Sequence, residues 1–434
     1  MSPEIIGLLG LLTLFVLLTC GIPIGISLGL VGLVGLAVLL GPEAAVIKLG
    51  VTNFEVISKY ELGVLPLFLL MAHLCFAAGA SRDFFAVAAR FIGHKRGGLA
   101  LASIAGCAGF GAVSGSSLAT VATVGSAALP EMRKAGYAPS LAAGSLAAGG
   151  TLGALIPPSG ALIVFGILAE QSIGTLFAAA ILPGLSQAVF YMLAIAILCA
   201  IRPALGPRHA RVAWRTRLAG LKKIIDIMLL VLFVIGGMML GWFTPTEAAS
   251  VGVLAAFGLC WLRGAFTKTL ITDAFSKTLG TSGMIYLIII GAMVFATFIS
   301  ASGLAAYLSE LVVAIDASPV VAILMMALIL LVLGSFLDGL ALMLLTTPIF
   351  LPIALDLGYS PIWFGIFLVR AMEVGFILPP LGLNAYVLQG IAKDISLATI
   401  FKGIGPFLIA DLLHLGFIIA VPAFVLWLPT VTGV

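Results

Sequence analysis

The chain has 434 residues, of which 62% are hydrophobic and only 9% are charged, and its mean hydropathy is +1.29. No soluble domain has an interior large enough to bury that much apolar surface, so the composition excludes a soluble protein and indicates a membrane protein. The net charge of +4 does not indicate a nucleic-acid partner, because 18 of the 21 Lys and Arg residues lie in five short segments between apolar runs.

These basic segments predict the topology. They cover residues 81–98, 131–139, 202–223, 263–278 and 393–402. Loops on the cytoplasmic side of a membrane are enriched in Lys and Arg, so all five segments are predicted to be cytoplasmic. Both termini are then predicted to lie on the outer side, together with the loops at residues 42–60, 170–173, 242–247 and 304–318.

Apolar runs of about 20 residues, the length of a helix that spans a bilayer, recur from end to end of the chain. The first run has neither a basic stretch before it nor a cleavage site after it, so we expect a retained helix rather than a removed signal peptide. Ten crossing helices are predicted, in chain order at residues 3–20, 24–41, 62–80, 141–169, 174–201, 224–242, 247–263, 281–303, 362–391 and 404–429.

Residues 99–130 do not fit as a crossing. Basic residues flank both ends, and two full crossings would need about 40 residues plus a turn, more than this segment has. Gly, Ala, Ser and Thr dominate the segment, and such small residues allow helices to pack closely. We therefore predict a re-entrant helical hairpin with its tip at "SGSS", residues 114–117.

A second hairpin is predicted at residues 319–355. Asp316 and Asp356 bracket this segment, and no basic residue lies near either end. Both ends are therefore predicted to lie outside, so this hairpin enters the membrane from the opposite face. Its centre carries the sequence "FLDGLA", residues 336–341.

The chain contains an internal repeat at an offset of 222 residues. The stretch 129–163 aligns without gaps on 351–385, with ten of the 35 positions identical, and "GALIPPSG" at 153–160 is answered by "GFILPPLG" at 375–382. The same offset pairs the helices of residues 1–205 with those of 223–434, on either side of a basic linker at 206–222. Five crossings in each half make the second half inverted in the membrane, which is typical of transporters.

Each Pro–Pro pair interrupts a predicted helix, at 141–169 in the first half and at 362–391 in the second. Each interruption lies about 18 Å along its helix, near the middle of a hydrocarbon core of about 30 Å. Proline frees backbone carbonyls, and carbonyls beside Ser and Thr hydroxyls are ligands for a hard cation. Two similar ion sites are therefore predicted, with simple helix kinks as the alternative.

Four stretches carry a family resemblance: "SGSSLATVATVGSAALPEMRKAGY" (114–137), "GTLGALIPPS" (150–159), "FLDGLALMLLTTPIFLPI" (336–353) and "EVGFILPPLGLN" (373–384). They resemble the large membrane subunit (DctM-like) of the TRAP transporters, which are tripartite periplasmic carriers. The resemblance implies an all-α polytopic membrane protein with a sodium-driven elevator mechanism in the bacterial inner membrane. It also implies two partners, a small four-helix membrane subunit (DctQ-like) and a periplasmic solute-binding protein (DctP-like).

The resemblance also implies the residues of two sodium sites. The family usually has Thr or Ser just before the second Pro–Pro pair, whereas this chain has Leu378, which offers only its carbonyl oxygen. The first site is implied at Ser114, Ser116, Ser117, Gly150, Thr151 and Gly153, and the second at Asp338, Gly339, Gly375 and Leu378.

Arg370 is the one basic residue predicted inside a membrane segment, where a charge costs about 2.5–3.5 kcal/mol on insertion scales. It either pairs with Glu373, three residues further along the same helix face, or meets the carboxylate of an acidic substrate. Asn384, Ser159 and Glu373 complete the predicted substrate-binding residues. Asp411 and His414, one turn apart in the last helix, are predicted to pair internally or to contact the scaffold.

The predicted function is sodium-coupled uptake of a small organic acid, received from a periplasmic binding protein, by alternating access. One alternative is a proton-coupled carrier with Asp338 and Glu373 as relay groups, and another is a stand-alone anion carrier. An intramembrane serine hydrolase built on "SGSS" is a remote alternative, because no motif ties a histidine to these serines. No enzymatic activity is therefore expected.

Overall fold

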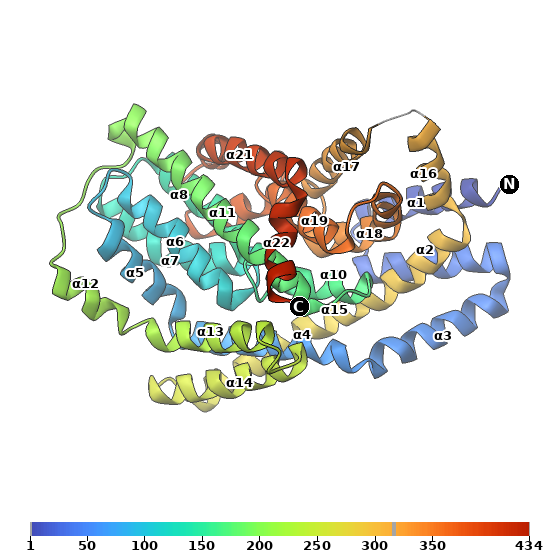
Figure 1. Ribbon diagram of the computed structural model, residues 1–434, viewed down its shortest axis with the longest axis horizontal. Coiled ribbons are helices and arrows are strands. Elements are labelled where there is room, and N and C mark those ends of the chain that lie inside the picture. Colours follow the sequence, from blue (N-terminus) through green and yellow to red (C-terminus); the bar gives the residue numbers. More distant parts are fainter. Residues whose placement is uncertain (1, 315–317, 434) are drawn as a thin grey trace.

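The computed structural model describes residues 2–314 and 318–433, and every regular element within them is a helix (Figure 1). The elements of the first half are α1 (Pro3–Thr19), α2 (Ile24–Leu40), α3 (Pro42–Ser58), η1 (Tyr60–Gly63), α4 (Val64–Ala77), α5 (Ala80–Ile92), α6 (Gly98–Ser114), α7 (Ser117–Lys134), α8 (Pro139–Gly150), α9 (Leu152–Leu155), α10 (Gly160–Leu168) and α11 (Ile173–Ile201).

The remaining elements are η2 (Pro203–Leu205), α12 (Trp214–Leu221), α13 (Ile225–Met239), α14 (Pro245–Leu262), α15 (Lys268–Ala301), α16 (Leu304–Ala314), α17 (Pro319–Gly334), α18 (Gly339–Asp356), α19 (Pro361–Gly375), α20 (Leu383–Ile391), α21 (Leu397–Ala420) and α22 (Pro422–Thr432). Many of the helices, α8 and α19 among them, begin at a proline, whose missing N–H is not needed in the first turn.

The described helices agree only in part with ten uninterrupted crossings. By length and composition, six helices are able to cross a membrane, and a seventh is added if α8–α9 and α10, bent by 41°, count as one span. Several other predicted crossings coincide with shorter apolar helices, among them α1, α2 and α13. The last predicted crossing, at 404–429, is two helices, because the chain breaks before Pro422.

The same order of elements occurs in both halves at the offset found in the sequence. Helix α7 covers residues 117–134, and α18 covers residues 339–356, each bound 222 residues further on. Helices α8 and α19 start at Pro139 and Pro361, which the same offset relates. The halves also differ: α3 and α4 are separated by a break at Lys59 whereas α15 runs without interruption for 34 residues, and α11 is one helix whereas α21 and α22 are two.

Both predicted hairpins are present. Helices α6 and α7 pack against each other around a turn at Gly115, whose φ of +60° favours glycine, and α17 packs against α18 around residues 335–338. Figure 1 places α6 and α7 toward one end of the molecule and α17 and α18 toward the other. Asp316, on which the outer position of the second hairpin partly rested, lies outside the described residues.

Several predicted loops are helical. Residues 42–58 form α3, residues 304–314 form α16, and the basic segment 81–98 contains α5, which buries Phe84 and Phe85 on one face. Helix α15 begins at Lys268, earlier than its predicted start. Hydropathy detects long apolar runs, but an amphipathic helix has polar residues on its exposed face and escapes that criterion.

The five basic segments meet at one end of the molecule. Two backbone hydrogen bonds tie the linker to its neighbours, from Gly97 to the Gly206 carbonyl (2.9 Å) and from Ala138 to the Leu205 carbonyl (3.0 Å). Two ion pairs join the other segments, Arg133 with Asp394 (2.6 Å) and Arg263 with Asp83 (2.8 Å). The hydrogen bond from Arg133 lowers the pKa of the Asp394 carboxyl. The grouping expected from the charge pattern is therefore present.

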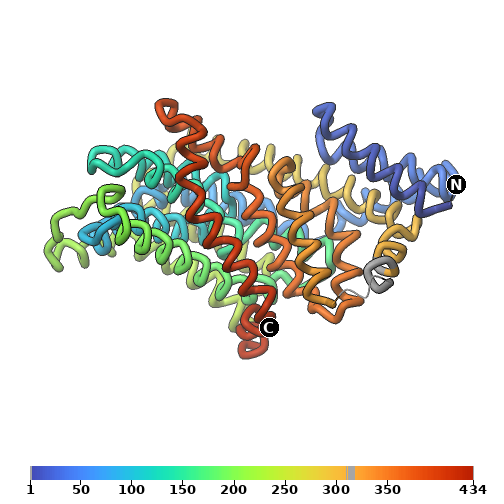
Figure 2. Tube along the Cα trace, turned by 90° about the horizontal axis from the view of Figure 1, so that it is seen from above, coloured from blue at the N-terminus to red at the C-terminus, as the bar shows by residue number. Residues whose placement is uncertain are grey.

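The helices pack as two groups. Helices α2, α4, α14 and α15 pack on one another, with α1, α3 and α13 beside them, and we call this group the scaffold. The second group consists of the hairpins, the interrupted helices, α11 and α21, with α8 packed along α21. Figure 2 shows α21 crossing the middle of the molecule while α1 and α2 lie at one end.

Candidate functional site

One cavity, with a volume of about 280 Å³, lies where the elements singled out by the sequence meet. Both hairpin tips, both interrupted helices and the scaffold helices α4 and α15 contribute to its wall. We call it the tip cavity. Its lining includes Ser116 and Ser117 from the first tip, Asp338 and Gly339 from the second, Glu373 before the second interruption, and Thr281 from the scaffold.

The first tip lies directly against the first interruption. A Cβ atom built on Gly153 would be 2.5 Å from the Thr120 hydroxyl oxygen and 2.6 Å from the Ser116 carbonyl oxygen. One on Gly150 would be 2.0 Å from a methyl carbon of Val121. A side chain at either position would clash with the tip. Glycine has no Cβ atom, so the backbone of the interrupted helix can contact the tip directly.

The hydroxyl groups of the first tip form a small network. The Ser114 and Thr120 hydroxyl oxygens are 2.8 Å apart, and the Thr120 hydroxyl also donates to the Ser116 carbonyl at 2.8 Å. The Ser116 side chain caps α7 by accepting from the Ala119 N–H. Thr120 was not predicted as a site residue, although its place four residues after Ser116 puts both on one helix face.

Thr151 lies at the first interruption, as predicted, but its hydroxyl is directed toward α11. The hydroxyl donates to the Ala148 carbonyl at 2.7 Å and lies 2.8 Å from the Tyr191 hydroxyl. Tyr191 is fully buried and was missed by the sequence interpretation, because nothing in its local sequence marks it. A hydroxyl that donates one hydrogen bond keeps lone pairs with which it can bind a cation.

Two residues of the second half complete the first tip. The Ser117 hydroxyl donates to Glu373 at 2.5 Å, and the Asn384 amide donates to the Ala147 carbonyl at 3.0 Å. Both Glu373 and Asn384 are fully buried. One oxygen of each, Oε1 and Oδ1, has no hydrogen-bond partner among the described residues. Buried acceptors are normally satisfied, so these two oxygens fit the needs of a bound cation.

The second tip and interruption also pack together. A Cβ atom on Gly375 would be 2.7 Å from the Gly334 carbonyl carbon, and one on Gly339 would be 2.6 Å from the Met372 sulfur. Asp338 caps α18 by accepting from the Leu340 N–H at 3.2 Å, a common role for an aspartate immediately before a helix.

The two interruptions differ in exposure. Pro157 and Pro158 are buried, whereas Pro379 and Pro380 are exposed, and both Pro–Pro peptide bonds are cis. Leu378, which lacks the family's hydroxyl, is half-buried, and its N–H donates to the Gly375 carbonyl at 3.1 Å. The cation ligands available at the second interruption are therefore its backbone carbonyls. The Asp338 carboxylate, at the tip of the second hairpin, is a further candidate ligand.

Arg370 does not pair with Glu373 and does not line the tip cavity. Its guanidinium forms an ion pair with Asp411, and its Nε donates to His414 Nδ1 at 3.1 Å. The Gln187 amide donates to the same Asp411 oxygen at 2.5 Å. The Arg370 side chain is 1% exposed. The spacing in the sequence pointed to Glu373 on the same helix. The observed partners, Asp411 and His414, are brought to Arg370 by the packing of α21 on α19.

Ser159 also lies away from the tip cavity. Its hydroxyl donates to the Ala154 carbonyl at 2.5 Å and accepts from the Leu162 N–H at 3.2 Å, so it caps α10. The local sequence Pro–Pro–Ser–Gly explains this role, because serine is a preferred residue immediately before a helix. Of the four predicted substrate-binding residues, only Glu373 lines the tip cavity.

The chain is similar to known transport proteins over nearly its whole length. A family profile described as "Tripartite ATP-independent periplasmic transporter, DctM component" matches residues 11–424. The C4-dicarboxylate TRAP transporter large permease protein DctM of Pseudomonas aeruginosa is 36% identical over 408 residues, covering 94% of each chain. The sialic acid TRAP transporter large permease protein SiaM of Vibrio cholerae is 32% identical, covering 99% of this chain and 98% of its own.

A third relative, the ectoine TRAP transporter large permease protein TeaC of Halomonas elongata, is 30% identical and covers 96% of this chain and 97% of its own. Among solved structures, the YdaH transporter of Alcanivorax borkumensis matches with a TM-score of 0.61 over 88% of both chains. At 17% identity, that match shows a shared fold. These sequence relatives are permeases and not enzymes, and the chain therefore belongs to the DctM family, the large membrane component of the tripartite ATP-independent periplasmic transporters.

Proposed function

We propose that this permease takes up a small organic acid together with sodium across the bacterial inner membrane. It works with a DctQ-like small membrane subunit and receives its substrate from a DctP-like periplasmic binding protein. The observation that carries this proposal is the tip cavity, where both hairpin tips and both interrupted helices face two scaffold helices. Convergence of two related, interrupted elements on one cavity is typical of secondary transporters.

The residues present fit two sodium sites. In the first site, the hydroxyls of Ser114, Ser116, Ser117 and Thr151 would bind the ion together with carbonyls at Gly150 and Gly153. In the second, the Asp338 carboxylate would act with carbonyls at Gly339, Gly375 and Leu378. The buried, unpartnered oxygens of Glu373 and Asn384 beside the first tip support a positive charge there. When bound, sodium supplies that charge and couples uptake to its own gradient.

The same cavity suits a small acid. No basic side chain occurs among the described residues that line it, so a carboxylate must be held by other means. The N-termini of α7 and α18 both reach the cavity, and helix N-termini attract anions through free N–H groups. Asp338 already accepts from the Leu340 N–H at the start of α18, so we propose that the N–H groups at the start of α7, together with sodium, hold the substrate carboxylate. Arg370 has a structural role through its buried ion pair with Asp411.

The packing also supports an elevator mechanism. Each tip is in close contact with its own interrupted helix, so hairpins and interruptions form one unit. The scaffold contributes only Leu69, Thr281, Met284 and Ile285 to the lining of the tip cavity. We infer that this unit moves as a body against the scaffold and carries the cavity from one side of the membrane to the other.

Uptake into proteoliposomes tests this function. The vesicles should contain both membrane subunits and the binding protein, with sodium and pH gradients imposed separately. C4-dicarboxylate, sialic acid and ectoine, the substrates named for relatives, form the first panel. We expect uptake to follow the sodium gradient. Uptake that follows only the pH gradient would favour a proton-coupled carrier. Uptake in the absence of the binding protein would favour a stand-alone carrier.

Single substitutions at the tips test the ion sites. We expect Ser116→Ala and Asp338→Ala each to raise the sodium concentration for half-maximal uptake about tenfold, because each removes one ligand worth about 1.5 kcal/mol. Thr13→Ala and Asp273→Ala, both at exposed positions, are matched controls and should leave that concentration unchanged. An unchanged sodium dependence in both tip variants would show that the ions bind elsewhere.

A further inference from the structure

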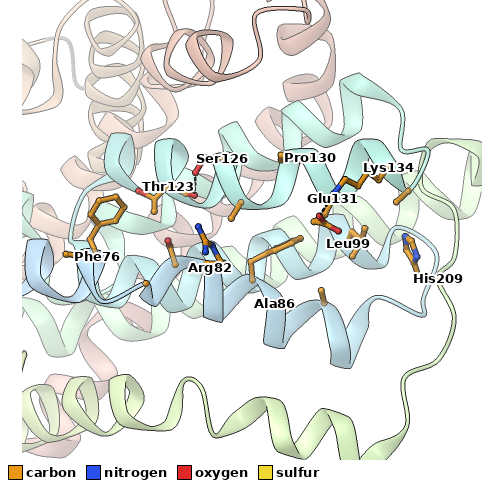
Figure 3. Close-up of a pocket in the computed structure, with 17 residues that line it drawn as sticks. Phe76, Arg82, Ala86, Leu99, Thr123, Ser126, Pro130, Glu131, Lys134 and His209 are labelled. Atoms are coloured by element: carbon orange, nitrogen blue, oxygen red, sulfur yellow. Dashed lines mark hydrogen bonds and ion pairs between the residues drawn. The ribbon is translucent and has the colours of Figure 1, made fainter. Parts of the chain in front are cut away.

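A second and larger hollow lies between α5 and α7, with a volume of about 1030 Å³ (Figure 3). It opens at the basic end of the molecule and shares no lining residue with the tip cavity. We call it the α5–α7 cleft. Its wall combines apolar side chains, such as Phe76 and Phe85, with polar ones, including Arg82, Thr123 and Ser126.

Arg82 is the unpaired cation of this cleft. Figure 3 shows its side chain rising from α5 toward Thr123 and Ser126 on α7. Lys134, the other cation of the wall, is paired with Glu131 at 3.1 Å. Arg82 is exposed and has no ion pair or hydrogen bond with any side chain or carbonyl that the structure describes. Its guanidinium therefore remains available to an anion.

The cleft reaches deep along the first hairpin. Helix α7 runs from Ser117 at the tip to Lys134 at the basic end. At 1.5 Å per residue, Thr123 lies about 9 Å from Ser117 and about 16 Å from Lys134. No described residue is the partner of Arg82 and its side chain is exposed, so its guanidinium is accessible to a solute that enters the cleft.

We propose that the α5–α7 cleft is the passage by which the carboxylate substrate leaves the tip cavity toward the basic end, with Arg82 as a transient anion-binding position. This inference rests on the proposed function. A guanidinium forms charge-assisted hydrogen bonds with a carboxylate, and a cleft of positive potential raises the local concentration of anions. A single, exposed cation attracts the substrate without trapping it.

Cysteine labelling tests the passage without sodium or substrate. Thr123→Cys is introduced together with Cys20→Ser, which removes the exposed cysteine among the five. An anionic and a cationic methanethiosulfonate are then applied from either side of membrane vesicles. We expect labelling only from the face that carries the basic segments, with the anionic reagent faster. Arg82→Gln should lower the ratio of anionic to cationic rate about fivefold, as expected for loss of about 1 kcal/mol of attraction.

Arg82→Lys should preserve the ratio, and Arg96→Gln, the same change at an exposed loop position outside the cleft, should leave it unaltered. An equal ratio with and without Arg82 would overturn the proposal, as would labelling from the opposite face. The labelling is repeated in nanodiscs with and without anionic lipid. We expect the ratio of anionic to cationic labelling rates to be the same in both. A preference that anionic lipid abolishes would identify a headgroup site and overturn the passage.

The last measurement is the rate of uptake into proteoliposomes. Its substrate is whichever of C4-dicarboxylate, sialic acid and ectoine the reconstituted system transports. Arg82→Gln should lower the maximal rate of uptake several-fold and leave the ratio of maximal rate to KM at the outer face unchanged, because exit alone is slowed. An unchanged maximal rate in a variant that has lost the anionic preference would place the cleft off the transport path. Labelling needs neither sodium nor substrate, so it tests the passage alone. The proposed function is tested separately by uptake into proteoliposomes, and the two can therefore fail independently.

Discussion

Replacing Asp411 by asparagine is expected to destabilise the protein by about 3–5 kcal/mol and to abolish uptake, because Arg370 would keep a buried charge without its counter-ion. Arg370 and Asp411 are both fully buried, and no exposed route allows the guanidinium to reach water. Thermal unfolding in detergent measures the loss of stability, and the yield of folded protein after extraction provides a second measure.

Asp394→Asn is the matched control for this prediction. It removes the same kind of charge from an ion pair with Arg133, but its side chain is 66% exposed and water replaces the partner. We expect an unchanged Tm. The double variant Arg370→Met with Asp411→Leu should recover much of the lost stability, since apolar residues often replace a buried ion pair without cost. If Asp411→Asn unfolds at the same temperature as Asp394→Asn, the buried pair contributes nothing.

Gly153→Ala is expected to raise the sodium concentration for half-maximal uptake at least about tenfold, because displacing a ligand oxygen costs about 1.5 kcal/mol or more. The new methyl carbon would lie 2.5 Å from the Thr120 hydroxyl oxygen and 2.6 Å from the Ser116 carbonyl oxygen. Either the tip or the interrupted helix must then move, and both belong to the proposed first sodium site. Sodium titration of uptake in proteoliposomes gives the result.

Gly160→Ala provides the control from the same interruption. A Cβ atom there would meet its nearest neighbour, the Gly115 carbonyl oxygen, at 3.8 Å, which is an ordinary contact. The variant adds the same methyl group seven residues along the chain, so we expect an unchanged sodium dependence. A Gly153→Ala protein that is folded and binds sodium as tightly as the unsubstituted chain would contradict the proposed first site.

Local features predicted the architecture. The small-residue content of residues 99–130, with basic residues at both ends, predicted the hairpin formed by α6 and α7. The repeat at an offset of 222 predicted where α18, α19 and α20 would lie, and the Pro–Pro pairs predicted both interruptions. The composition, the flanking charges and the Pro–Pro pairs are each found within a few tens of residues, and the repeat is found by comparing two such stretches. None of these features depends on how the helices pack.

The candidate site was predicted less completely. Within each half the structure places the tip beside the interruption, and it adds contacts of Glu373 and Asn384 with the first half that the sequence did not predict. Ser117 and Glu373 are 256 residues apart, and the repeat relates equivalent positions rather than contacting ones. Ser159, predicted to bind substrate, caps α10, and the local sequence is sufficient to predict that capping role.

By itself, the sequence determined the membrane class, the grouping of basic segments at one end, the two hairpins and the two interrupted helices, because composition, charge and repeated motifs act locally. Only the tertiary structure decided that Arg370 pairs with Asp411, that both halves build the first tip, and that Arg82 stands unpaired in a deep cleft. A buried charge or amide takes whichever partner the packed helices bring to it, and that choice depends on how distant helices settle against one another.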